Sequence, residues 1–193
     1  MASNTRLGKR KSSEEEETSP SKKANTETAK DESAEEKTEV KFEGVNMNIN
    51  FAIVKEEEVM SFKELKDQPV ATLQGIGPKL SGELAKLNIK TIQQMADYKF
   101  YHLAKCIKTL AETEEAGKRA EDAKLNLENG LIKEFEPYPL KDLLEQPIHA
   151  LQGLSEAADK TFSNLGVKNI EGFADFKYFR WAEAIVTAAK WEE

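Results

Sequence analysis

The sequence predicts an all-α protein in which two copies of one helical unit are joined by a long helix and preceded by a disordered tail. One observation behind this prediction is an internal repeat, because the chain matches itself without a gap at an offset of 78 residues. Another is that each copy places apolar residues at helical spacing between typical helix-start and helix-end residues. Finally, only one short segment alternates apolar and polar residues, so it has no second strand to pair with.

The composition excludes several classes of protein. With 193 residues, 39% of them hydrophobic, the chain has room for one domain of ordinary size beside unstructured sequence. No apolar run approaches the ~20 residues of a membrane-spanning helix, so no membrane partner is expected. A single cysteine excludes an intrachain disulfide and a cysteine-rich zinc site, and we expect neither a metal nor a cofactor. The net charge of -7 argues against strong non-specific DNA binding.

Residues 1–39 have the composition of a disordered tail, since they are rich in Ser, Thr, Glu and Lys and nearly lack aliphatic and aromatic residues. Two basic clusters resemble a bipartite nuclear-import signal and consist of Lys9, Arg10, Lys11, Lys22 and Lys23. Candidate phosphorylation sites that would add negative charge beside these clusters are Ser12, Ser13 and Ser19. We therefore expect a nuclear protein. The alternative is that the tail is only a solvated, charge-mixed segment and that the protein is cytoplasmic.

Residues 40–60 are predicted to form an extended arm. The alternation of apolar and polar residues from Val45 to Phe51 is typical of a β-strand. Because the rest of the chain offers no partner strand, we expect the arm to lie on the helical body or to pair with another molecule.

The duplicated unit is predicted to occupy residues 61–111 in the first copy and residues 137–193 in the second. About a third of the aligned positions between 62–111 and 140–189 are identical, which is more than shared composition explains. The linker 112–136 combines alanines with Glu/Lys and Glu/Arg pairs at i, i+4 spacing. We expect the last helix of the first copy to continue through most of this linker.

Local signals place the helix ends within each copy. Side chains that cap helix starts mark where helices begin, and residues that tolerate the left-handed conformation follow the helix that comes after the glycine turn. The starts are Ser61 with Glu64, Thr91 with Gln94, and Asn169, and the ends are Asn88 and Gly166.

One turn of the first copy carries a recognisable motif. It reads Leu73-Gln74-Gly75-Ile76-Gly77-Pro78-Lys79 and is followed by an apolar helix. Over about 24 residues this segment resembles the helix-hairpin-helix motif of proteins that bind DNA without sequence specificity. The resemblance implies a tandem helix-hairpin-helix protein, and it implies that Gly75, Ile76, Gly77 and Lys79 bind a phosphate of the nucleic-acid backbone.

The chemistry of the turn supports the same interpretation independently. Gly75 and Gly77 permit a tight turn with no side chain over its amides, and the helix that follows points its positive end at the same place. Lys79 adds a point charge in the first turn of that helix, and Ile76 is expected to hold the turn against the core. The alternative is that the two glycines serve only the architecture of the connection.

The second copy lacks the residues on which this binding would depend. Gly77, Pro78 and Lys79 correspond to Ser155, Glu156 and Ala157, so an acid stands where a phosphate would approach. Ser155 and Glu156 are favourable at a helix start, with Ser155 as the cap. The second copy is therefore expected to keep the fold without the phosphate site.

Aromatic residues recur near the start of the last helix of each copy. The set comprises Tyr98, Phe100, Tyr101, Phe176, Tyr178, Phe179 and Trp181. Stacking on nucleobases is one interpretation. Packing in the core and between the copies is the favoured one, because both copies place aromatics at the same positions.

These observations favour a non-enzymatic function. The sequence has no nucleophile–base pair, no metal-ligand spacing and no Walker-type glycine loop. The leading hypothesis is a nuclear protein that contacts the nucleic-acid backbone weakly, without sequence preference, through the first hairpin. The alternatives are an adaptor that binds a protein partner after losing DNA contact, and a degenerate targeting module of a repair or recombination enzyme.

Overall fold

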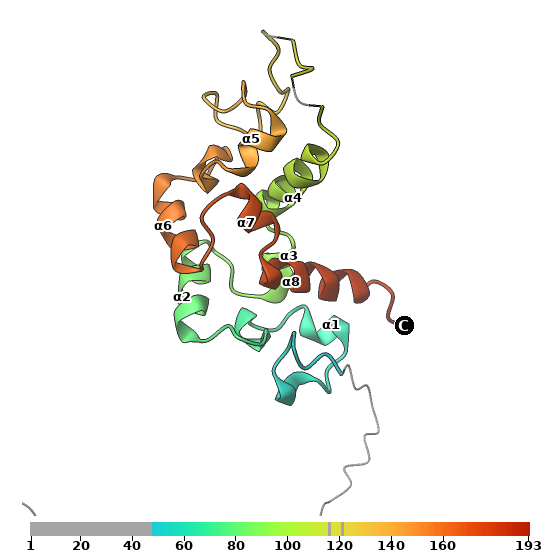
Figure 1. Cartoon of the computed structure of the whole chain (residues 1–193). Helices are drawn as coiled ribbons and strands as arrows, with labels where there is room; N and C mark the ends of the chain where they lie inside the picture. The colour runs from blue at the N-terminus through green and yellow to red at the C-terminus, as the bar shows by residue number, and fades with distance from the viewer. Residues whose placement is uncertain (1–47, 116, 121) are drawn as a thin grey trace, which may run out of the picture. The chain divides into compact units, whose positions relative to one another are not determined.

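The computed structural model describes residues 48–115, 117–120 and 122–193, all within the compact unit Lys41–Glu193. This part of the chain is helical and contains no β-strand, which confirms the all-α class (Figure 1). Its α-helices are α1 Phe62–Leu65, α2 Pro78–Lys86, α3 Ile92–Ala96, α4 Lys99–Ala111, α5 Leu140–Leu144, α6 Glu156–Asn164, α7 Ile170–Ala174 and α8 Lys177–Ala188. Its 3-10 helices are η1 Lys55–Glu57, η2 Val70–Thr72 and η3 Ile148–Ala150.

The predicted capping signals are confirmed. Ser61 and Thr91 each form a complete capping box, with Glu64 and Gln94 respectively. Asn169 accepts a hydrogen bond from the amide of Gly172 at the start of α7. After α2 and α6 the chain passes through positive φ, 61° at Asn88 and 85° at Gly166.

The repeat extends further toward the amino terminus than its predicted boundary. Ile53 pairs with Leu73 in an antiparallel bridge, and Leu131 pairs with Leu151 in the same way at an offset of 78 residues. The strand-like alternation from Val45 to Phe51 does not form a strand in its described part, because residues 50–52 form a turn and Asn48 has a φ of 47°. The described end of the predicted arm therefore belongs to the first unit and lies along its glycine turn.

The prediction of a long helix between the copies is wrong. Helix α4 ends at Ala111, and the described residues of 112–129 form turns, bends and irregular loop without a helix, with a φ of 68° at Gly117. The carboxylate of Glu114 accepts hydrogen bonds from the amides of Leu140 and Lys141, both at 2.9 Å. Burial raises the pKa of Glu114, but these two amides and the charge of Arg119 outweigh it and hold the pKa below its usual range. Capping α5 requires the chain to leave the helical path after Ala111.

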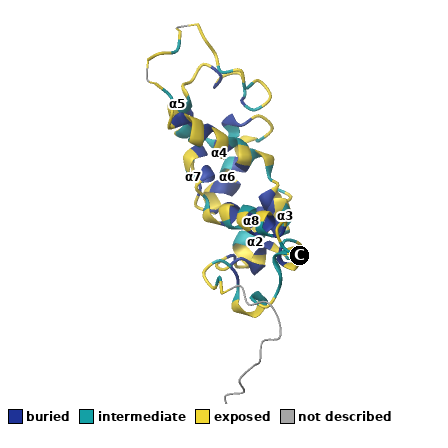
Figure 2. Cartoon of the chain, turned by 90° about the vertical axis from the view of Figure 1, so that its right-hand side faces the viewer, coloured by how far each residue is buried: buried dark blue, intermediate teal, exposed yellow. Residues whose placement is uncertain are grey.

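Each copy completes its core with the last helix of the other copy. Helix α4 packs on α5 and α7, whereas α8 packs on α1 and α3. The caps follow the same exchange, because Glu192 accepts hydrogen bonds from the amides of Phe62 and Lys63 at 2.6 and 2.8 Å, just as Glu114 caps α5. Figure 2 shows the buried residues on the inner sides of these helices. The two copies are thus interlocked halves of one core.

Some equivalent residues of the two copies meet each other directly. The rings of Tyr101 and Phe179 lie 5.2 Å apart, and the Lys105 ammonium lies 2.6 Å from the Glu183 carboxylate. Both pairs are related by the offset of 78 residues, so they mark a pseudo-twofold axis. Two identical copies would place like charges at the second pair, and the Lys/Glu difference replaces that repulsion with an ion pair.

Candidate nucleic-acid interface

The predicted phosphate site is a tight turn between η2 and the nine-residue helix α2. The amide of Ile76 donates to the carbonyl of Leu73 at 3.0 Å, which closes the turn. The Ile76 side chain is 4% exposed and lies in the core, as predicted. Gly75, Gly77 and Lys79 are all exposed, so the structure presents these three residues on one exposed turn.

The fold requires glycine at position 75. Its φ is +97°, in the region that side-chain-bearing residues rarely adopt. A Cβ atom there would lie 2.8 Å from the Tyr178 hydroxyl oxygen, because α8 of the second copy covers this turn. The equivalent Gly153 has a φ of +103°, and a Cβ atom there would lie 3.2 Å from the ring of Phe100. The glycine shared by the two copies is therefore explained by backbone conformation and close packing.

The fold does not require glycine at position 77. Its φ of -81° and ψ of 179° suit any residue, and a Cβ atom there would meet no atom within 4 Å. Ser155 holds the equivalent position with a similar backbone, at φ -104° and ψ 165°. Neither packing nor backbone geometry therefore explains why residue 77 is a glycine.

The start of α2 offers unused hydrogen-bond donors. Gly77 is the N-cap residue and no side chain caps the helix, while Pro78 fills the first helical position. Among the described residues, the amides of Gly77, Lys79 and Leu80 have no hydrogen-bond acceptor. Free amides at a helix start attract an anion, and Gly77 adds no side chain above them.

The charge around the turn is only weakly positive. The Glu83 carboxylate, one helical turn after Lys79, lies 2.8 Å from the Lys86 ammonium. This hydrogen bond from Lys86, with a smaller contribution from the charge of Lys79, holds the pKa of Glu83 below its usual range. Glu83 therefore stays ionised at neutral pH and offsets one of the two lysines.

The equivalent turn of the second copy keeps the shape and loses the charge. Glu156 and Asp159 lie in the first turn of α6. Ser155 is the N-cap residue as predicted, but its hydroxyl accepts no capping hydrogen bond. The Asp159 carboxylate instead bonds to both the amide and the imidazole of His149, a partner that no spacing in the sequence indicated.

The remaining predicted residues divide into two groups. The nuclear-signal candidates Lys9, Arg10, Lys11, Lys22 and Lys23 lie outside the described residues, as do the phosphorylation candidates Ser12, Ser13 and Ser19. The aromatic set packs in and against the core, which confirms the favoured interpretation: Tyr101, Tyr178 and Phe179 are buried, and the other four members are partly buried.

No family model, curated protein or solved structure matches the chain. Among the described residues, no helix is long and apolar enough to cross a membrane.

Proposed function

We propose that this chain is a non-enzymatic helix-hairpin-helix protein that contacts the nucleic-acid backbone weakly and without sequence preference through its first hairpin. The observation that carries the proposal is the contrast between the two glycines of the turn. Gly75 is explained by the fold, whereas Gly77 exposes backbone amides that nothing in the described structure uses.

The hairpin residues take different roles in this proposal. The amides of Gly77 and Lys79 donate to a phosphate oxygen, and the ammonium of Lys79 adds Coulomb attraction. Ile76 acts by anchoring the turn in the core, because its own amide already donates to Leu73. Gly75 sets the backbone direction through its positive φ. These groups contact no base edge, so the contact carries no sequence information.

The proposed contact is weak for an electrostatic reason. Lys79, Glu83 and Lys86 together contribute one net positive charge beside the turn. A single neutralised phosphate releases about one counterion, so the salt dependence of binding is expected to be shallow, with a slope of about -1.

Replacing Lys79 with glutamate tests the proposal. We expect DNA affinity at low salt to fall about tenfold and the salt slope to shrink by about one, equally for duplexes of unrelated sequence. The measurement is fluorescence anisotropy of a labelled short duplex with the full chain across a series of salt concentrations.

Lys160→Glu is the matched control, because Lys160 is an exposed lysine of α6 and the change alters net charge equally. If both variants weaken binding alike, the effect is general charge repulsion and the hairpin is not the site. If the wild-type chain shows no salt-dependent binding at all, the proposal is wrong and the adaptor hypothesis takes its place.

A nuclear location is the second part of the proposal, supported by the two basic clusters of the tail. Replacing Lys9, Arg10 and Lys11 with alanine is expected to shift a tagged full chain from the nucleus to the cytoplasm. Imaging of living cells measures the nuclear to cytoplasmic ratio. An unchanged ratio would show that these residues do not direct import.

A further inference from the structure

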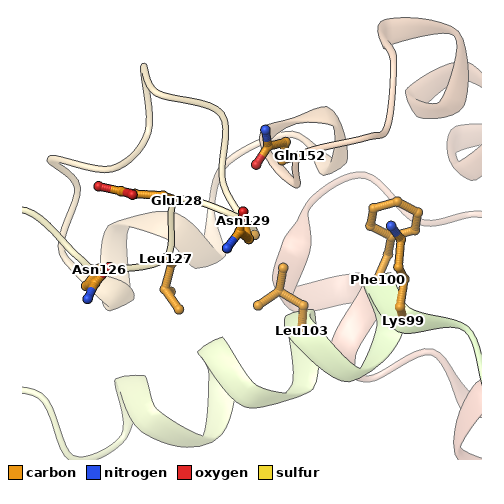
Figure 3. Close-up of a pocket in the computed structure, with 9 residues that line it drawn as sticks. Lys99, Phe100, Leu103, Asn126, Leu127, Glu128, Asn129 and Gln152 are labelled. Atoms are coloured by element: carbon orange, nitrogen blue, oxygen red, sulfur yellow. The ribbon is translucent and has the colours of Figure 1, made fainter.

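A cavity lies beside the turn of the second copy, away from the amides of the first hairpin. It has a volume of about 360 Å³ and is lined by α4, by the loop that precedes Leu131 and by Gln152 (Figure 3). The lining side chains used below are Lys99, Phe100, Leu103, Asn126, Asn129 and Gln152. This volume is at the lower end of the ~300–1,000 Å³ typical of small-molecule sites, which suits a single ring system.

Comparison of the two copies shows what distinguishes this cavity. Lys99 and Phe100 correspond to Lys177 and Tyr178, and in both copies the ammonium lies over the ring, at 4.8 and 4.9 Å. The third lining residue of α4, Leu103, corresponds to Trp181. The Trp181 indole lies 5.6 Å from the Tyr178 ring and 5.1 Å from the Lys177 ammonium. Leucine places no ring beside Phe100, so a planar ring from another molecule has room there.

The rim of the cavity is rich in amide side chains. Asn126, Asn129 and Gln152 are exposed, and their side-chain amides make no hydrogen bond to another described residue. Each amide carries both a donor and an acceptor, the combination that pairs with the edge of a nucleobase. The side chain of a bound Phe, Tyr or Trp has at most one polar atom, so it could hydrogen-bond to few of these amides, whereas a nucleobase edge carries several donors and acceptors. The rim therefore favours a nucleobase over an aromatic amino acid.

We propose that this cavity binds one unpaired nucleobase of a nucleic-acid strand, stacked beside Phe100 and Leu103 with its edge toward the rim amides. The site deepens the function proposed above and rests on it, because it adds a preference for unpaired bases to a protein that otherwise contacts only phosphates. A duplex keeps its bases stacked and paired, so it does not fill the cavity.

Nucleosides test the cavity separately from the hairpin, because they carry no phosphate. Adenosine or cytidine added to the full chain is expected to shift the methyl NMR signals of Leu103 saturably. Leu103→Trp, which restores the residue of the second copy, is expected to weaken this binding about tenfold or more. Gly77→Glu is expected to leave it unchanged. An absent shift, or an equal affinity in Leu103→Trp, overturns the proposal.

Leu103 packs closely on Gly130, where a Cβ atom would lie only 2.9 Å from a Leu103 methyl group. The larger ring of Leu103→Trp could therefore disturb the fold, so a second pair of variants is needed. Asn129→Ala and Gln152→Ala alter exposed residues and are each expected to weaken nucleoside binding about fivefold. Unchanged affinity in both overturns the assignment of the rim.

A strand experiment distinguishes a base within a nucleic acid from a free nucleoside. A short single strand is expected to bind about fivefold or more tightly than an abasic strand of equal length, and Leu103→Trp should remove that difference. If nucleosides bind but the two strands bind equally, the cavity takes a free nucleoside and the proposal of a strand base is wrong. The effect of Lys79→Glu on duplex binding is measured separately, so failure of the hairpin and failure of the cavity remain distinguishable.

Discussion

Replacing Gly75 with alanine is expected to destabilise the protein by about 2–3 kcal/mol, whereas the same change at Gly77 costs less than about 0.5 kcal/mol. An alanine at position 75 must hold a φ of +97° and place its Cβ atom 2.8 Å from the Tyr178 hydroxyl oxygen. Tyr178 is only 7% exposed, so its ring cannot move aside without disturbing the packing around it. At position 77 neither obstacle exists, since φ is -81° and the space above is open.

Urea unfolding of the two variants measures this difference directly. The double variant Gly75→Ala with Tyr178→Phe removes the oxygen that the new methyl group meets and is expected to recover about 1 kcal/mol, leaving the cost of the positive φ. Equal stability of Gly75→Ala and Gly77→Ala would contradict the distinction between an architectural and a functional glycine. The same Gly77→Ala protein, still folded, then reports on DNA binding without a stability artefact.

Much of the local structure could be predicted from the sequence, because the signals involve neighbouring residues. The capping boxes of Ser61 and Thr91 and the left-handed residue Asn88 each depend on contacts within one turn of chain. Comparing the two copies also separated Gly75, which is kept as Gly153, from Gly77, which is replaced by Ser155. The backbone geometry agrees, because Gly75 has a positive φ and Gly77 does not. For the caps and for Asn88 the physical cause lies within a few residues of the position concerned, whereas the close packing at Gly75 comes from Tyr178 of α8.

The exchange of last helices could not be predicted, because it leaves no trace in the periodicity. Helices α4 and α8 are copies of each other, so each shows the same apolar face whether it packs in its own unit or in the other. The choice depends on the path of the linker, and there the sequence favoured a continuous helix. Glu114 overrides that preference by capping α5 from a distance of 26 residues in the sequence.

One missed feature was visible in the sequence. Lys55 and Glu56 match Lys133 and Glu134 at the same offset of 78 residues that relates the helices. This match extends the repeat into segments that composition assigned to an arm and a linker. The equivalence was concealed because the arm shows strand-like alternation, whereas the linker shows alanines and charge pairs at helical spacing.

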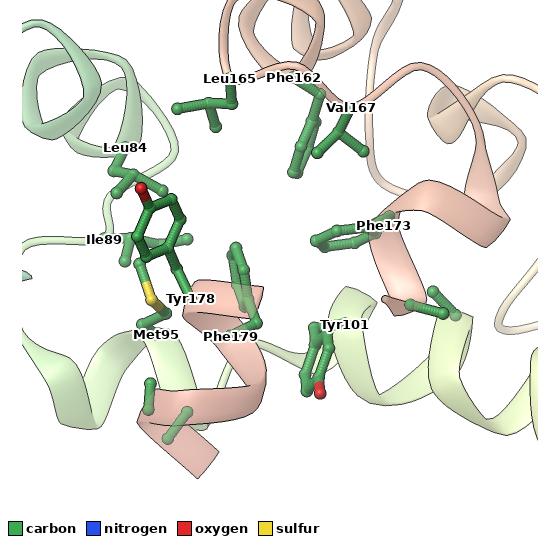
Figure 4. Close-up of a cluster of buried hydrophobic side chains, with 14 of the residues drawn as sticks. Leu84, Ile89, Met95, Tyr101, Phe162, Leu165, Val167, Phe173, Tyr178 and Phe179 are labelled. Atoms are coloured by element: carbon green, nitrogen blue, oxygen red, sulfur yellow. The ribbon is translucent and has the colours of Figure 1, made fainter. Parts of the chain in front are cut away.

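Replacing Phe179 with alanine is expected to have the largest effect on stability, at about 3–5 kcal/mol. Phe179 is fully buried, and its ring lies 5.2 Å from the rings of both Tyr101 and Phe173 (Figure 4). These three aromatics come from α8, α4 and α7, so the deletion leaves a cavity where both copies meet. The loss is a large part of the ~5–15 kcal/mol that typically stabilises a domain of this size.

The exchanged helices determine how this loss is distributed. Because α8 packs on α3, Phe179→Ala is expected to accelerate hydrogen exchange of the α3 amides in the first copy as much as that of the α7 amides in the second, by about a hundredfold or more. Trp191→Ala is the control, since Trp191 is 85% exposed and its removal should change neither set. If each copy completed its own core, the loss of Phe179 would accelerate exchange only in the second copy. Acceleration confined to α7 would therefore contradict the interlocked arrangement. Equal acceleration in both helices would show that the glycine turns at Gly75 and Gly153, each covered by an aromatic of the other copy, are held by a single cooperative core.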